Sequence, residues 1–153
     1  IMMNHQAATR RWRNGFAPAL VAVICLAVMV PVVAAGEVVV VANESVAEDL
    51  VGRKDLQRIY LGKKSTWDDK TRIVPVILKE GPVHEEFVED VVGRSTNRFT
   101  SYWRQMIFTG KGVPPKSFAN EAEVVAFVKA TPGAVGYVSP RTDVTGVKVL
   151  TVD

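Results

Sequence analysis

Apolar and polar positions alternate along the chain between short β-branched runs and amphipathic segments. The run EVVVVAN, from Glu37 to Asn43, is continuous and β-branched, which indicates a strand buried on both faces. RIVPVIL, residues 72–78, indicates a second strand, and Pro75 within it favours an edge position or a bulge. AVGYV (134–138) and VKVLTV (147–152) indicate two closing strands.

Helical spacing of apolar residues marks four segments between these strands, at 53–61, 84–92, 97–108 and from Asn120 to Thr131. Asn120 with Glu123 resembles a capping box, and Thr131-Pro132-Gly133 ends that helix. Helices between strands predict an α/β fold, with a mainly parallel sheet flanked by helices. The predicted inward positions are Leu56, Ile59 and Tyr60; Phe87, Val91 and Val92; Phe99, Trp103, Met106 and Ile107; and Val124, Phe127 and Val128.

The N-terminal segment has the pattern of an export signal. Arg10, Arg11 and Arg13 precede an uncharged run, residues 15–35, which ends in small residues. A basic region, an apolar region and a small-residue ending predict a signal peptide over residues 1–35, cleaved after Ala35. We therefore expect a periplasmic domain over residues 36–153. The alternative is an uncleaved membrane anchor, because the run is long enough to span a bilayer.

The net charge of residues 36–153 limits the classes of function that this domain can have. The chain has 19 Lys and Arg against 16 Asp and Glu, and residues 1–35 hold three of the arginines and none of the acids, so residues 36–153 carry 19 − 3 = 16 of each sign. A neutral domain is a poor candidate for nucleic-acid binding, which depends on a basic surface. Cys25, the single cysteine, lies before the expected cleavage point, so we expect no disulfide.

The segment IYLGKKSTWDD, residues 59–69, contains residue types that are common in phosphate-binding loops. A Walker A loop would need a glycine at position 57, where Gln57 stands, and a strand before the loop. Gly62 instead follows the last apolar position of a predicted helix, where a left-handed glycine ends helices. We interpret the segment as a helix end, with Trp67 packed on the core.

Catalytic and metal-binding patterns are not found in residues 36–153. His84 is the single histidine of this part, which excludes a zinc site built from His and Cys. No serine lies in a G-x-S-x-G motif, so a catalytic triad through His84 is disfavoured. Glu85 and Glu89 could form an acid–base pair, but carboxylates at this spacing are typical of a solvated helix face. We predict neither enzyme activity nor a metal or other cofactor.

One junction is a candidate ligand site. Lys79 to His84 leads from a predicted strand into a predicted helix, where free backbone N–H groups and the helix dipole attract an anion. Gly81 allows close approach, and Lys79 and His84 add positive charge. We predict oxyanion binding through Lys79, Gly81, Val83 and His84. The alternative is an ordinary turn with solvated charges.

The order of four segments, DLQRIYLGKKSTWDD, RIVPVIL, FTSYWRQMIFTGKG and VVAFVKATPGAVGYVS, resembles the type 2 periplasmic binding proteins. The resemblance is to small relatives of the phosphate-binding protein of ABC transporters, and it covers almost all of residues 36–153. It implies a single α/β lobe that binds phosphate or a similar oxyanion and has an ABC permease or a membrane sensor as partner.

The chain departs from that family at the ligand site. Lys79 stands near the family's arginine, and Gly81-Pro82-Val83 replaces its Ser-Gly-Thr motif, so the resemblance implies weak binding. A second wall for the ligand would come from a partner or from a second copy in a homodimer. The alternative is an accessory protein that kept the fold and lost the phosphate site.

Overall fold

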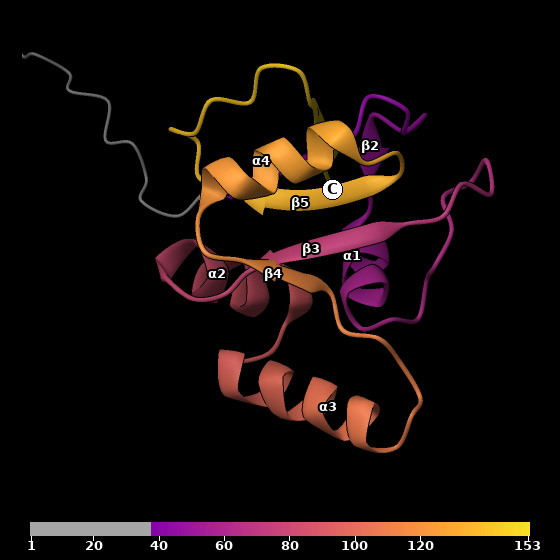
Figure 1. The fold of residues 1–153 in the computed structure, drawn as a ribbon, viewed down its shortest axis with the longest axis vertical. Helices are drawn as coiled ribbons and strands as arrows, with labels where there is room; N and C mark the ends of the chain where they lie inside the picture. The colour runs from indigo at the N-terminus through magenta and orange to yellow at the C-terminus, as the bar shows by residue number, and fades with distance from the viewer. Residues whose placement is uncertain (1–37) are drawn as a thin grey trace, which may run out of the picture. The chain divides into compact units, whose positions relative to one another are not determined.

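The computed structural model describes residues 38–153 as a six-stranded sheet with helices on both faces (Figure 1). The strand order is β2-β6-β1-β5-β3-β4. β3 pairs in parallel with β4 and β5, and β2 with β6, whereas β1 is antiparallel to β5 and β6. The α/β class and the mainly parallel sheet are confirmed, with β1 as the antiparallel exception.

The elements are β1 Val39–Ala42, β2 Leu50–Val51, α1 Arg53–Tyr60, β3 Val74–Leu78, α2 Pro82–Glu86, η1 Phe87–Val92, α3 Thr96–Phe108, β4 Lys116–Phe118, α4 Glu121–Ala130, β5 Ala134–Val138 and β6 Lys148–Val152.

The prediction of an edge position or bulge from Pro75 is wrong for the strand as a whole. β3 lies inside the sheet, between β5 and β4. Val74 donates its backbone N–H to Gly133 on the β5 side, so position 75 faces the β4 side, where pairing begins only at Val76. Pro75 therefore lacks an N–H at a place where the neighbouring strand has not yet begun.

Helices pack against β5 from both faces of the sheet. A Cβ at Gly136 would lie 2.8 Å from Val124 of α4, so the missing side chain lets α4 pack directly on the sheet, along β5 in Figure 1. On the opposite face, the Tyr60 hydroxyl of α1 lies 3.2 Å from the carbonyl oxygens of both Val76 and Val135. Tyr60 also contacts Phe87 edge to face, at a centroid distance of 4.7 Å. The core thus lies on both sides of the sheet.

The helix predicted over residues 84–92 begins earlier, at Pro82, and changes to a π-helix at Phe87. The buried residues of the π-helical part are Phe87, Val88 and Val92, whereas Val91 is only partly buried. A π-helix spaces its hydrogen bonds five residues apart, so Phe87 and Val92 share a face. The assumption of α-helical spacing missed Val88.

α3 packs against the end of α1 through two aromatic side chains. Trp103 Nε1 donates to the carbonyl of Tyr60 over 3.1 Å, and the Tyr102 hydroxyl donates to that of Leu61 over 2.7 Å. Phe99 and Trp103 are buried as predicted, but Ile107 is 55% exposed and was predicted wrongly as inward. Met106 is partly buried against the core, whereas Ile107 lines an open hollow.

The segment 59–69 is a helix end, as predicted. Gly62 has a positive φ of 71°, and a Cβ there would meet the Trp103 ring at 3.0 Å. Trp67 is buried and its Nε1 donates to the Gly133 carbonyl over 3.0 Å. The glycine and the tryptophan are scaffold residues.

Candidate functional site

The junction between β3 and α2 has the backbone form expected of a strand-to-helix turn. Gly81 lies immediately before α2 with φ 107° and ψ 169°, a conformation that side-chain-bearing residues rarely adopt. Pro82 occupies the first turn, and no side chain of residues 38–153 caps the helix. Glu85 donates its N–H to the Gly81 carbonyl over 3.0 Å. Glycine and proline at this point therefore set where α2 begins.

The four residues predicted to bind a ligand do not face one hollow. Lys79 and His84 line a hollow of ≈ 330 Å³ on the side of α3, which we call the α3 hollow. Gly81 and Val83 line another, of ≈ 460 Å³, on the side of α4, which we call the α4 hollow. The structure thus divides the predicted site between two sides of the junction.

The α3 hollow combines cations and hydroxyl groups over an apolar floor. Lys79 and Arg104 are exposed, and neither forms an ion pair within the described residues. Thr100 and Ser117 add hydroxyl groups, and no carboxylate is among the lining residues. The rest of the lining is His84, Ile77, Phe99, Trp103, Ile107, Pro114 and Pro115.

His84 is held at the base of this hollow by a buried hydrogen-bond chain. Its side chain is 6% exposed, and Nδ1 lies 2.6 Å from the hydroxyl of Tyr137, which in turn accepts the Leu78 N–H over 3.1 Å. Burial raises the pKa of Tyr137, so this hydroxyl keeps its proton. Among the residues that the structure describes, Nδ1 is the one further partner for that proton, so we assign the O–H to donate there and the ring hydrogen to Nε2.

The protonation state of His84 agrees with this assignment. Burial lowers the pKa of its imidazole, although the nearby Glu85 carboxylate acts in the opposite direction. At neutral pH the ring is therefore uncharged, and Nε2–H can act as a hydrogen-bond donor. The positive charge expected of His84 from sequence is not present, which leaves Lys79 and Arg104 as the cations of the α3 hollow.

The α4 hollow has the opposite electrostatic character. Glu80 and Glu121 contribute carboxylates to its lining. Glu121 accepts hydrogen bonds from the Ser139 N–H, over 2.7 Å, and from the Thr142 hydroxyl. Burial would raise the pKa of Glu121, but these hydrogen bonds outweigh it and lower the pKa. Two donors that an anion could use are thus already bound to a carboxylate of the chain itself.

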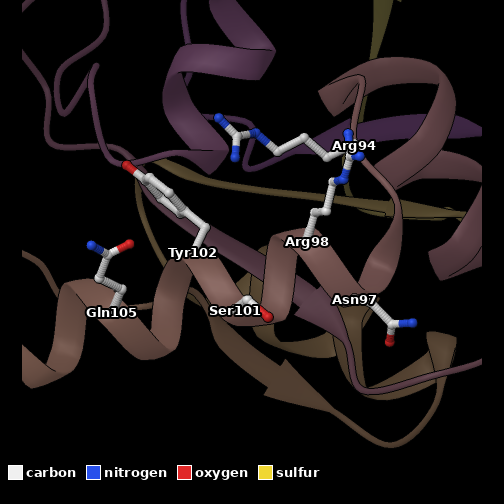
Figure 2. A pocket seen from close by; sticks show the side chains of 6 residues that line it. All are labelled: Arg94, Asn97, Arg98, Ser101, Tyr102 and Gln105. Atoms are coloured by element: carbon white, nitrogen blue, oxygen red, sulfur yellow. The ribbon is translucent and has the colours of Figure 1, made fainter.

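A third hollow, of ≈ 360 Å³, lies along α3 and is lined by residues of this helix and by Arg94 before it (Figure 2). Figure 2 shows the side chains of Arg94 and Arg98 on the same side of the helix. The Arg94 guanidinium lies 5.1 Å from the centre of the Tyr102 ring, a cation–π contact. The remaining lining residues are Asn97, Ser101 and Gln105.

Sequence reasoning missed the residues that complete the α3 hollow. Thr100 and Arg104 are four residues apart on α3, beside the stripe of Phe99 and Trp103, and this spacing placed them on a common face. Ser117 lies on β4, a three-residue strand that has no clear sequence pattern. Nothing in the sequence indicated that β4 would lie next to β3.

Within residues 38–153 the structure contains no group of three or more His, Cys, Asp or Glu side chains arranged to hold a metal ion. In the same part of the chain, no helix has both the length and the apolar character needed to cross a bilayer.

The comparisons with known proteins identify the fold through structure. The chain matches no protein-family model and no curated protein sequence. It is similar to an ABC-type phosphate transport receptor from Vibrio cholerae, with a TM-score of 0.59 and 16% identity over 76% of this chain and 46% of that one. A putative phosphate ABC transporter substrate-binding protein from Clostridium perfringens, with bound phosphate, has a TM-score of 0.60 and 17% identity over 77% and 45%.

PstS from Borrelia burgdorferi is similar to the same extent, with a TM-score of 0.61 and 11% identity over 77% of this chain and 47% of that one. This chain thus spans less than half the length of these structures. The TM-scores establish a shared fold, and at identities this low the comparison extends to the fold alone. The chain therefore has the fold of one periplasmic-binding-protein-like lobe, similar to the phosphate substrate-binding proteins of ABC transporters.

Proposed function

We propose that this chain is an exported solute-binding protein, which binds phosphate or a similar oxyanion in the α3 hollow and delivers it to an ABC-type permease. The observation that carries the proposal is the lining of this hollow. Lys79 and Arg104 supply positive charge, and no carboxylate opposes it. The similarity of the fold to phosphate transport receptors supports an oxyanion as the ligand.

The donors around the hollow suit a small oxyanion. The hydroxyl groups of Thr100 and Ser117 and the Nε2–H of His84 can donate to its oxygens, while Lys79 and Arg104 balance its charge. The Nε2–H of neutral His84 orients the oxyanion but adds no positive charge to the hollow. Gly81 and Val83, which the sequence also predicted as ligand residues, take part only through the backbone turn that orients Lys79 and His84.

We expect the affinity to be weak, because the hollow is open to solvent and a single lobe cannot enclose the ligand. Water competes for each donor of an open site, and the hydrogen bonds gain less than in a closed one. A second wall could come from the permease, from a membrane sensor or from a second copy of the chain. Each of these would raise the apparent affinity.

A second function is favoured by the α4 hollow. Gly81-Pro82-Val83 carries no hydroxyl group, and Glu121 already binds the donors of Ser139 and Thr142. Under this alternative the protein is an accessory or interaction protein, which kept the fold and lost the phosphate site. It would act through a protein contact and not through a solute.

Calorimetric titration with inorganic phosphate, together with thermal unfolding, separates the two functions. At about 100 times Kd a ligand stabilises the folded state by about 2.7 kcal/mol. Each kcal/mol raises the melting temperature by about 4–8 °C in domains of 60–100 residues and by about 2–4 °C in domains of 150–250 residues, and this domain lies between these sizes. Lys79→Ala should remove most of both the heat of binding and the rise in melting temperature, because it removes one of the two cations of the hollow.

Lys63→Ala is the matched control, because Lys63 is an exposed lysine outside the hollow. Phosphate also stabilises proteins through exclusion from their surface, so every titration is repeated at the same ionic strength in chloride. If parent, Lys79→Ala and Lys63→Ala gain equal stability and show no heat of binding, the α3 hollow does not bind phosphate. The accessory function would then be the better explanation.

A further inference from the structure

A basic segment without carboxylates runs through α3 and the loop that follows it. Between residues 94 and 116 the sequence contains five Lys and Arg residues and no Asp or Glu. None of the five forms an ion pair within the described residues. α3 is the outermost element at one end of the described unit (Figure 1), so this charge lies at the periphery. The five residues are Arg94, Arg98, Arg104, Lys111 and Lys116.

Three large apolar side chains project from the C-terminal end of the same segment. Phe108 is 90% exposed, Val113 85% and Ile107 55%. We call these three residues the apolar tip. The loop between them contains Gly110, which has a positive φ of 67°, and a Cβ at this position would meet no atom within 4 Å. The tip therefore protrudes instead of packing on the core.

Cations and the apolar tip share the outward face of α3. Ser101, Arg104 and Phe108 recur at intervals of three and four residues, and all three are exposed. Arg98 lies one turn further toward the N-terminus and is also exposed. An exposed aromatic residue thus lies beside arginines on a surface that Phe99 and Trp103 hold firmly from the inner side.

We propose that this surface docks on an anionic phospholipid bilayer, with the apolar tip inserted at the headgroup level and the cations placed on lipid phosphates. Basic residues around exposed aromatic and aliphatic side chains are the composition that binds such interfaces. The hollow of Figure 2, with Arg94, Arg98 and hydroxyl and amide groups, can receive one headgroup phosphate.

The shape of the tip favours a lipid surface over an acidic protein. Protein interfaces place their main anchors in well-packed pockets, whereas Phe108 and Val113 stand almost fully in solvent. A protruding tip can enter a fluid bilayer without a preformed pocket. Among the described residues, Glu89 contributes a carboxylate to a hollow that Arg94 and Arg98 also line. This hollow lies near the N-terminal end of α3, whereas the apolar tip lies at its C-terminal end. The proposal does not depend on phosphate binding in the α3 hollow.

A fluorescent label at the tip tests the proposal in the full chain. Cys25→Ser removes the native cysteine, and Val113→Cys places an environment-sensitive fluorophore at the tip. The label reports the surroundings of residue 113, so attachment of the chain through residues 15–35 does not by itself shift its emission. We expect a blue shift with vesicles of phosphatidylglycerol and phosphatidylcholine, and none with phosphatidylcholine alone. Arg141→Cys, labelled in the same way, is the control outside the basic segment.

Charge variants show whether the cations hold the tip in place. Removing one cation near an anionic surface costs about 1 kcal/mol, which is about a fivefold change in the equilibrium constant. Arg98→Gln with Lys111→Gln should therefore lower insertion of the tip about 25-fold, and raised salt should act in the same direction. Both residues are exposed and lie outside the α3 hollow.

Three results would overturn the proposal. Equal emission shifts at positions 113 and 141, or equal shifts with neutral and anionic vesicles, would show that the tip does not recognise an anionic bilayer. A shift that grows with protein concentration in the absence of vesicles would show that a second copy of the chain covers the tip.

Discussion

At the scale of single residues, His84 and Tyr137 form a buried polar contact beside the candidate site. The Tyr137 hydroxyl lies between the Leu78 N–H and Nδ1 of His84, and in the assigned arrangement, with the O–H donating to Nδ1, the imidazole is neutral. Burial lowers the pKa of His84 in the folded state below its ordinary value of about 6.5. The unfolded state then binds more protons, so stability is fully present above about pH 6.5 and falls as the pH is lowered toward the folded pKa. We predict a lower free energy of unfolding at pH 5.5 than at pH 7.5, measured by urea denaturation.

His84→Asn provides the control for this prediction. The asparagine oxygen can still accept the Tyr137 hydroxyl, but the side chain does not titrate. The variant should lose most of the difference between pH 7.5 and pH 5.5, whatever its stability at neutral pH. If the difference persists unchanged in His84→Asn, other groups cause it and the imidazole is not held neutral by the fold.

Single residues also show where prediction from sequence stopped. Lys79, Gly81, Val83 and His84 could be assigned to one strand-to-helix junction, because glycine and proline mark such turns locally. Their division between two hollows depends on which neighbours α3 and α4 bring to each side. The charge state of His84 depends on Tyr137, which is 53 residues away in sequence. Contacts of this separation are not encoded in a local pattern.

At the scale of elements, α3 joins a buried inner face to a fully exposed end. Trp103 is 6% exposed and donates a hydrogen bond to the Tyr60 carbonyl. Removing a large buried aromatic side chain costs about 3–5 kcal/mol, a large share of a typical total of about 5–15 kcal/mol. We predict that Trp103→Ala loses this amount of unfolding free energy, or fails to fold, in chemical denaturation.

Phe108→Ala on the same helix is the matched control, since Phe108 is 90% exposed. Its unfolding free energy should remain within about 0.5 kcal/mol of the parent. A Trp103→Ala protein as stable as Phe108→Ala would mean that the inner face of α3 has been placed wrongly.

The predicted elements were most accurate where a pattern was long and regular. α1, α4 and β5 agree with their predicted ranges, and Asn120 accepts the Glu123 N–H over 2.9 Å as a capping residue. The short strands β2 and β4 were missed because two or three residues give no measurable alternation. The inward positions of η1 shifted because a π-helix changes the period on which the prediction relied.

At the scale of the whole molecule, the described residues form one lobe of a fold that the similar structures build with more chain. The structures similar to this chain are more than twice as long as the part that it covers. The lobe itself was predictable, because strands separated by helices leave few alternatives to a flanked, mainly parallel sheet. The position of β1, antiparallel between β5 and β6, was not predictable, since the sequence of a buried strand does not record its direction.

Export is the remaining prediction at this scale, and it concerns residues that lie outside the described part of the chain. The pattern of residues 1–35 predicts cleavage after Ala35, where small residues occupy the positions that a signal peptidase reads. We predict that the protein recovered from the periplasm begins at Gly36, as measured by intact mass.

Two substitutions at the predicted cleavage point sharpen this test. Ala35→Phe places a large side chain directly before the cut and should block processing, so the chain accumulates with residues 1–35 attached. Ala34→Phe changes the middle position of the A-x-A-like motif, which tolerates large residues, and should be processed like the parent. If the parent itself keeps residues 1–35 and remains in the membrane fraction, the apolar run is a membrane anchor. The lobe would then act while tethered to the bilayer.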